Sequence, residues 1–241
     1  MMTKEIEKAS VLIEALPYIR RFAGTTIVVK YGGSAMVDPA IKYSVIQDIA
    51  MLKRIGLRPV IVHGGGPSIT TMLDRLGKES RFVNGLRETD EETAQIAEMI
   101  LSGSIGKDIV KSLQNQGIDA VGINGKDGDT LIAKKLLVDG EDVGFVGEVS
   151  KVNTTLLETL MSNDFVPVVS PVGTDSECNT YNINADYAAS AVAGALHAQK
   201  LVFLTDVEGI LRDKDDSSTI IRQLSISDAE RFIADGTIKG G

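Results

Sequence analysis

The sequence is poor in the residues that build disulfides and protein-bound metal centres. Cys178 is the single cysteine among 241 residues, which excludes an intrachain disulfide and a cysteine-based zinc or iron–sulfur site within one chain. His63 and His197 are the two histidines, too few for a histidine-rich metal site. We therefore expect no metal held by the protein alone.

Long apolar runs and an excess of positive charge are also missing. The opening residues MMTKEIEKAS lack the apolar core of a signal peptide, and no apolar run approaches the ~18 residues of a membrane span. The 25 Lys and Arg against 33 Asp and Glu give a net charge of -8, whereas nucleic-acid binding relies on clustered Lys and Arg. We expect a cytoplasmic enzyme or binding protein that engages neither membrane nor nucleic acid.

Glycine, in contrast, is abundant, with 24 residues whose positions are informative. Two β-branched runs end in glycines, TTIVVKYGG at 25–33 and RPVIVHGGG at 58–66, and a third, KLVFLTDVEG at 200–209, opens into an acidic turn. Consecutive glycines let backbone N–H groups approach an anion, and a following helix N-terminus adds positive potential. The alternative is that these are ordinary turns between strands and helices.

Helical and strand patterns alternate along the chain. Helices are predicted at 3–22, 37–54, 67–76, 90–102, 105–116, 154–163, 185–196 and 227–236. Strands are predicted at 25–33, 58–66, 119–123, 165–172 and 200–209, hairpins at 80–90 and 119–150, and a polar turn at 173–182. Pro17 is expected to kink or end the first helix. The alternation predicts an α/β fold, a three-layer αβα sandwich with a mostly parallel central sheet, an N-terminal helix and β-hairpins at a sheet edge.

The common nucleotide-binding signatures are absent. The sequence contains no G-x-x-x-x-G-K-[ST] phosphate loop, no G-x-G-x-x-G and no protein-kinase signature set. Because ligands of α/β sheets bind beyond the carboxyl ends of the strands, the two glycine loops are the candidate anion sites. His63 ends an apolar strand and is expected to be structural rather than catalytic.

Five polar residues are further candidates. Lys30 interrupts an apolar strand, where its charge needs an anionic partner. Arg87 could clamp a carboxylate through two hydrogen bonds, although a surface arginine is the simpler interpretation. Asn182, Asn184 and Asp186 lead into a helix, so one of them is expected to cap it, and together they suggest a polar site.

Several motifs follow one another in a fixed order. They are K-x-G-G at 30–33, V-H-G-G-G at 62–66, N-G-L-R at 84–87, G-K-D-G at 125–128, G-F-V-G-E-V at 144–149, N-I-N-A-D at 182–186, L-T-D-V-x-G-I-L at 204–211 and G-T-I-K-G-G at 236–241. Each motif alone is weak, and G-K-D-G alone is most simply a turn. In this order they resemble the amino acid kinase family over residues 16–241. N-G-L-R with N-I-N-A-D most resembles the members that phosphorylate N-acetyl-L-glutamate.

The resemblance implies an activity and its cofactors. The γ-phosphoryl group of ATP, bound with Mg²⁺, would pass to the side-chain carboxylate of N-acetyl-L-glutamate, a step of arginine biosynthesis. A carboxylate is already ionised at neutral pH, so the reaction needs alignment and charge neutralisation rather than a general base. Two alternatives are a family member with another carboxylate or carbamate acceptor and a nucleotide-binding regulator without catalysis.

The resemblance also implies roles for individual residues. Lys30 would stabilise the transferring phosphoryl group, and Asp186 would hold the lysine ammonium in place. Contacts to N-acetyl-L-glutamate are expected from Gly64, Gly65, Arg87, Asn182 and Asn184. Contacts to ATP are expected from Gly32, Gly33, Thr205, Asp206, Val207, Glu208, Gly209, Ile210, Leu211 and Lys239.

Domain organisation and partners follow from the same resemblance. One kinase domain is expected, with an N-terminal lobe at 23–170 and a C-terminal lobe at 171–241. The helix at 1–22 resembles that of arginine-inhibited members, where it joins dimers into a hexamer and Tyr18 matches the arginine site. Some members also bind a PII-type signalling protein. The family pattern continues past G-G into Met-x-Pro-Lys with a second catalytic lysine. Either Gly241 therefore lies inside a longer protein, as we expect, or the chain is a poor catalyst.

Overall fold

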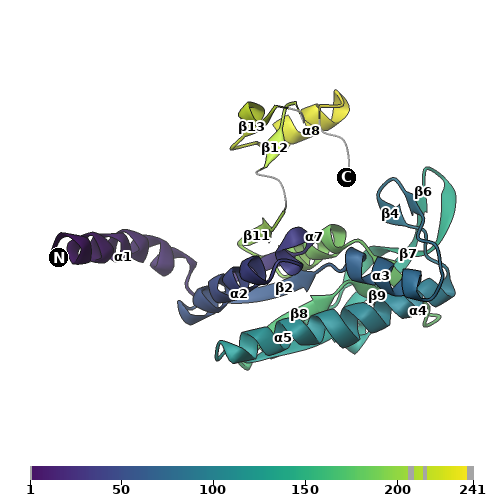
Figure 1. Cartoon of the computed structure of the whole chain (residues 1–241), viewed down its shortest axis with the longest axis horizontal. Helices are drawn as coiled ribbons and strands as arrows, with labels where there is room; N and C mark the ends of the chain where they lie inside the picture. Colours follow the sequence, from purple (N-terminus) through teal and green to yellow (C-terminus); the bar gives the residue numbers. More distant parts are fainter. Residues whose placement is uncertain (1, 206–208, 214–215, 238–241) are drawn as a thin grey trace.

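The computed structural model describes residues 2–205, 209–213 and 216–237, and it is built on a five-stranded sheet. The strands lie in the order β11-β1-β2-β8-β5 (Figure 1). Their bounds are β1 (Thr26–Tyr31), β2 (Arg58–His63), β5 (Ala120–Asn124), β8 (Val166–Ser170) and β11 (Lys200–Phe203). Every neighbouring pair runs parallel, so the predicted parallel sheet is confirmed.

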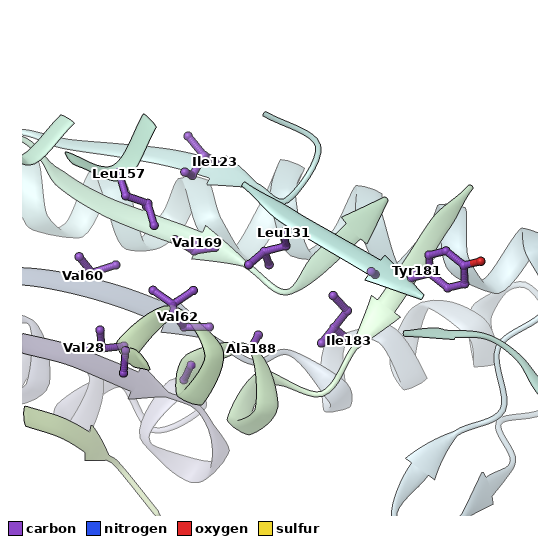
Figure 2. Close-up of a cluster of buried hydrophobic side chains, with 14 of the residues drawn as sticks. Val28, Val60, Val62, Ile123, Leu131, Leu157, Val169, Tyr181, Ile183 and Ala188 are labelled. Atoms are coloured by element: carbon purple, nitrogen blue, oxygen red, sulfur yellow. The ribbon is translucent and has the colours of Figure 1, made fainter. Parts of the chain in front are cut away.

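Helices cover both faces of this sheet. One face packs on α2 (Pro39–Arg54) and α5 (Gly106–Asn115), and the other on α6 (Thr155–Ser162) and α7 (Ala185–Ala195). Successive strand residues point to opposite faces, so Val28 joins the cluster on the α7 side and Val29 the cluster on the α2 side. Figure 2 shows the first cluster, in which Val62 of β2 lies between Val28 and Ala188 of α7. The three-layer sandwich is therefore confirmed.

The helix predicted at 67–76 is α3 (Gly66–Arg75). The stretch predicted as two helices at 90–102 and 105–116 is one continuous helix. It consists of α4 (Glu91–Glu98), the π-helical segment η2 (Met99–Ile105) and α5. The prediction of two separate helices is wrong because Gly106 keeps helical angles, φ -58° and ψ -40°. A π-helical turn contains one residue more than an α-helical turn, so it accommodates that residue without breaking the helix.

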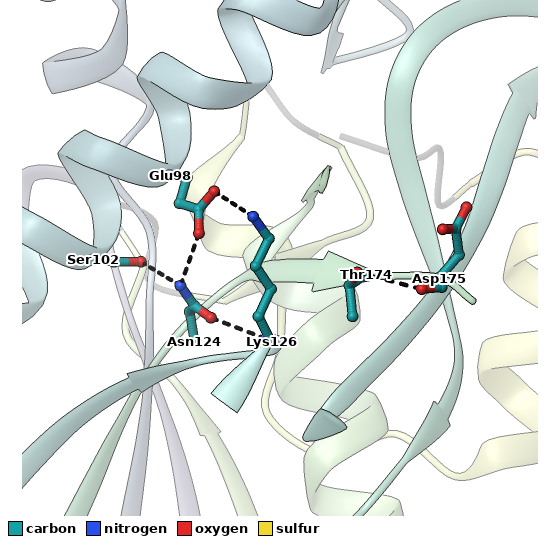
Figure 3. A network of polar contacts seen from close by, with 6 residues as sticks. All are labelled: Glu98, Ser102, Asn124, Lys126, Thr174 and Asp175. Carbon is teal, nitrogen blue, oxygen red and sulfur yellow. Dashed lines mark hydrogen bonds and ion pairs between the residues drawn. The ribbon is translucent and has the colours of Figure 1, made fainter. Parts of the chain in front are cut away.

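A polar network anchors this long helix to the sheet (Figure 3). Lys126 Nζ lies 2.6 Å from Glu98 Oε2, and Asn124 Nδ2 donates to Ser102 Oγ at 3.2 Å. Asn124 ends β5, and the predicted turn at 125–128 follows it and leads into the 3₁₀ turn η3 (Asp127–Asp129). The network therefore fixes the π-helical segment against the carboxyl end of the sheet.

The hairpins form separate sheets rather than an edge of the central one. β3 (Phe82–Val83) pairs with β4 (Leu86–Arg87) alone. A closed ring of four strands contains β6 (Leu131–Val138), β7 (Glu141–Val152), β9 (Val172–Thr174) and β10 (Thr180–Ile183). The edge placement is thus wrong, and the polar turn predicted over 173–182 is confirmed only for 175–179, between β9 and β10. Alternate residues of β10, Tyr181 and Ile183, are buried in the core, so this end of the polar segment pairs as a strand.

Both ends of the chain reach away from this body (Figure 1). At one end, α1 (Met2–Phe22) continues through Pro17. Of the two outcomes expected at Pro17, an end of the helix is wrong, because proline removes one backbone hydrogen bond yet keeps a helical φ, and a kink stays a prediction. At the other end, β12 (Ile210–Leu211), β13 (Ile220–Ile221) and α8 (Ile226–Ala234) form a small group beyond β11. None of the described helices is long and apolar enough to cross a membrane.

The boundary between the expected lobes at residue 170 stays a prediction. Beyond it, β11 pairs with β1, and α7 packs on β1 and β2. Residues from both sides of the boundary therefore meet at the carboxyl ends of the central strands.

Candidate active site

The first of two neighbouring cavities lies at the carboxyl ends of β1 and β2, with a volume of about 330 Å³. Lys30, from β1, lines it with a side chain only 15% exposed. Its Nζ lies 3.1 Å from Oδ1 of Asp186, at the start of α7. This ion pair supplies the anionic partner expected for Lys30, and their catalytic roles stay predictions.

Two glycine loops wall this cavity, and close contacts explain several of the glycines. A Cβ on Gly32 would lie 3.0 Å from the Lys30 ammonium nitrogen, so the absence of a side chain makes room for that group. Gly33 has a positive φ of 66°, a conformation that favours glycine. A Cβ on Gly65 would overlap the side chains of Leu101 and Ile105 from the π-helical segment.

The second cavity, about 170 Å³, holds Arg87. Arg87 is 6% exposed, and its guanidinium donates to Ser80 Oγ at 2.6 Å, Thr70 Oγ1 at 2.8 Å and the Gly66 carbonyl at 3.0 Å. The guanidinium carbon also lies 4.6 Å from the centre of the Phe82 ring. The interpretation of Arg87 as a plain surface arginine is therefore wrong.

Arg87 is a buried cation held by neutral groups. Burial lowers the pKa of its guanidinium, an effect that Asp74 opposes from a distance, yet an arginine remains charged in proteins. Within the described part of the chain, no carboxylate forms an ion pair with it. A buried charge without a counter-ion is costly, so the second cavity is suited to an anion.

The asparagines lie where α7 begins. Asn184 caps the helix by accepting from the Asp186 N–H at 2.8 Å, which confirms that one of the three polar residues is a cap. Asn182 lines the second cavity, and its amide donates to Thr89 Oγ1 at 3.4 Å.

The two cavities share a wall. Gly64, Gly65, Gly66, Asn184 and Ala185 line both of them. Ligands held in the two cavities would therefore lie next to each other at the glycine loop at 64–66. This geometry is suited to passing a small anionic group between two ligands.

Other predicted ATP contacts lie elsewhere. Thr205, Gly209, Ile210 and Leu211 line neither cavity, and their roles stay predictions. Asp206, Val207, Glu208 and Lys239 lie outside the described residues.

Sequence reasoning missed the neutral groups around Arg87 and the contribution of the long helix. Ser104, Ile105 and Asp108 line the first cavity from that helix. The two glycines in L-S-G-S-I-G, at 101–106, were the signal, because glycines inside a helical pattern mark irregular backbone or close packing.

The carboxylates at the site decide whether Mg²⁺ would fit there. Among the described residues, no group of three or more His, Cys, Asp or Glu side chains could hold a metal ion. Asp108 and Asp186 do line the first cavity. One or two carboxylates together with substrate phosphates are what Mg²⁺ commonly uses, so the donor set fits a metal that arrives with a nucleotide.

Comparisons with known proteins identify the family. The sequence pattern of the amino acid kinase family matches residues 25–241. The acetylglutamate kinase of Desulforamulus reducens is 52% identical over 241 residues, covering 100% of this chain and 84% of that protein. That of Brachyspira hyodysenteriae is 49% identical over 235 residues, covering 98% and 81%.

A solved structure is also similar. It is N-acetylglutamate synthase from Neisseria gonorrhoeae, complexed with coenzyme A and N-acetyl-glutamate. The TM-score is 0.75 at 28% identity, with 86% of this chain and 47% of that chain covered. The chain therefore belongs to the amino acid kinase family and, within it, to the acetylglutamate kinases.

Proposed function

We propose that this chain transfers the γ-phosphoryl group of ATP to the side-chain carboxylate of N-acetyl-L-glutamate. The products are N-acetyl-L-glutamyl 5-phosphate, an acyl phosphate used in arginine biosynthesis, and ADP. The family supports the activity. The observation that carries it is the pair of cavities that share the glycine loop at 64–66.

On the donor side, the residues neutralise charge. The Lys30 ammonium lies in the first cavity and would contact the transferring phosphoryl group, whose negative charge spreads over its oxygens. Asp186 holds that ammonium in one place through the 3.1 Å ion pair. Mg²⁺ would supply further charge neutralisation at the ATP phosphates.

On the acceptor side, Arg87 would bind the α-carboxylate of N-acetyl-L-glutamate, with Asn182 as a second contact. The side-chain carboxylate then faces the shared glycine wall and attacks the phosphorus as an ionised nucleophile. The O–P bond to ADP breaks as the new one forms, and no proton has to be removed. This chemistry agrees with His63 being buried away from both cavities.

Trapping with hydroxylamine tests the activity, because it converts an acyl phosphate into a stable hydroxamate. We expect a hydroxamate signal that requires ATP, Mg²⁺ and N-acetyl-L-glutamate together. Carbamate and free L-glutamate are the matched alternative acceptors. A stronger signal with either one, or ATP binding without any hydroxamate, would favour the alternative family member or the regulator.

We also propose a homo-oligomer formed through α1. The apolar face of α1 that carries Ile6, Ile13 and Leu16, with Leu12 at its edge, is exposed, so no described segment of the chain covers it, and an apolar helix face needs a partner. The resemblance adds more specific expectations: a dimer or a hexamer, arginine as inhibitor, a PII-type partner and a cytoplasmic location. Light scattering should show a smaller assembly when residues 1–22 are deleted, and an unchanged mass would contradict the role of α1.

A further inference from the structure

His63 is a fully buried titratable residue that the proposed mechanism does not use. It ends β2 directly before the shared glycine loop, it is 0% exposed, and it lines neither cavity. Its Nδ1 lies 2.9 Å from the Gly64 carbonyl oxygen, and its Nε2 lies 2.9 Å from Ser170 Oγ at the end of β8.

These two partners fix the proton positions on the ring. A carbonyl oxygen can only accept, so Nδ1 carries the hydrogen and donates it to Gly64. Burial lowers the pKa of His63 to about 4, so the ring is neutral at pH 7 and Nε2 accepts from the Ser170 hydroxyl. The imidazole therefore has one tautomer and one orientation.

The hydrogen bond to Gly64 determines which way the loop presents its backbone. A trans peptide places its C=O and N–H on opposite sides. The Gly64 carbonyl points to His63, which lines neither cavity, so the N–H of Gly65 points to the opposite side of that peptide, and Gly64, Gly65 and Gly66 line both cavities. Among the described residues, this N–H donates to no backbone carbonyl.

The packing around the ring is shaped to this arrangement. Gly106 has an ordinary helical φ of -58°, so its backbone does not require glycine. A Cβ there would lie 3.1 Å from the Leu101 carbonyl oxygen and 3.3 Å from both His63 Nε2 and Ser170 Oγ, tighter than most carbon contacts. Gly106 therefore leaves the space that the pair of His63 and Ser170 occupies.

We propose that His63 is a positioning residue for phosphoryl transfer: locked by Ser170, it holds the Gly64 carbonyl so that the Gly65 N–H faces the junction of the two cavities. There the N–H donates to the group in transfer, as a preorganised backbone donor does at a developing negative charge. This inference rests on the proposed function.

Two amide variants separate positioning from packing. In His63→Asn the amide nitrogen takes about the place of Nδ1 and can still donate to Gly64. In His63→Gln the longer amide reaches the place of Nε2 and keeps Ser170 instead. Asn leaves the larger void, so it should lower the melting temperature more. If His63 positions the Gly64 carbonyl, the less stable His63→Asn keeps the higher kcat, and the kcat of His63→Gln is about tenfold lower. The KM for ATP should differ by less than about twofold between the two variants.

A kcat that follows the melting temperature in both variants, or an unaffected His63→Gln, would overturn the proposal. Ser170→Ala, a smaller change, should fold and give an intermediate kcat. A kcat equal to that of the chain without substitutions would count against the role of the hydrogen bond between Ser170 and His63.

A second measurement does not depend on catalysis: the Gly65 amide resonance is followed in ¹⁵N-labelled protein as a non-hydrolysable ATP analogue is added. It should move in the unchanged chain and in His63→Asn but not in His63→Gln. If the chain without substitutions formed no hydroxamate but showed these resonance shifts, the proposed function would be refuted and the role of His63 would stand. Equal shifts in all three proteins would refute the role of His63.

Discussion

Lys30 in the first cavity and Arg87 in the second are held in opposite ways. Lys30 is paired with a carboxylate of its own chain, and its partner Asp186 is 46% exposed. Arg87 is almost fully buried and is held by a hydroxyl pair, a carbonyl and an aromatic ring. In the described structure, the charge of Lys30 is balanced before any ligand binds, whereas the charge of Arg87 is not.

This difference indicates different tasks. A cation that already has a counter-ion gains little from a second anion in the ground state, so its value lies in charge that develops during transfer. A buried, unbalanced cation gains most when a permanent anion enters, so it contributes to binding. Removing Lys30 should therefore lower kcat, and removing Arg87 should weaken the binding of N-acetyl-L-glutamate.

The largest effect is expected from Lys30→Met. Losing one preorganised charge at the transferring group should lower kcat by roughly 10²–10³, with the Kd for N-acetyl-L-glutamate within about threefold. Hydroxamate trapping gives the rate, and calorimetry gives the affinity. The control is Lys53→Met, because Lys53 also pairs with an aspartate, Asp164, yet lines neither cavity. If the two variants were equally active, the ion pair at Lys30 would have no catalytic role.

A smaller loss, confined to binding, is expected from Arg87→Met. Truncating a buried hydrogen-bonded charge costs about 2–3 kcal/mol, or roughly 30- to 150-fold in Kd. Titration calorimetry should show that loss for N-acetyl-L-glutamate and less than about threefold for ATP. The control is the exposed Arg81→Met, two residues before Val83 in the same hairpin. Equal weakening of both ligands would mean that Arg87 supports the fold rather than the acceptor.

The sequence predicted some of these features better than others. Alternating strands and helices predicted the parallel sheet, because burial on both faces gives continuous β-branched runs. The ordered motifs predicted that Lys30 and Asp186 belong together, although 155 positions separate them. The surroundings of Arg87 were not predictable, since Ser80, Thr70 and the Gly66 carbonyl meet it only after the hairpin folds over α3 (Gly66–Arg75). The π-helical segment was missed because the predicted helices left a gap at 103–104, and the glycine there does not distinguish a break between two helices from irregular winding within one.

The smallest effect is expected from Gly32→Ala, which displaces the Lys30 ammonium without removing its charge. A Cβ on Gly32 would lie 3.0 Å from Lys30 Nζ and 3.2 Å from Cε, the flexible end of a side chain. Gly32→Ala should therefore move the ammonium by a fraction of an ångström and change the free energy of unfolding by less than about 1 kcal/mol. Misplacing a charge by that much should lower kcat by roughly tenfold, because Asp186 no longer holds the ammonium at its former distance.

The matched control for Gly32→Ala is Gly194→Ala. Gly194 lies in α7, the helix that carries Asp186, and a Cβ there meets nothing within 4 Å. It should raise the melting temperature slightly, since alanine is the better helix former, and it should leave kcat unchanged. If Gly32→Ala kept full kcat, catalysis would tolerate a shift of the Lys30 ammonium. It would then depend on the presence of the Lys30 charge and not on its exact position. A Gly32→Ala variant that loses kcat only in proportion to its stability would instead place the role of Gly32 in packing.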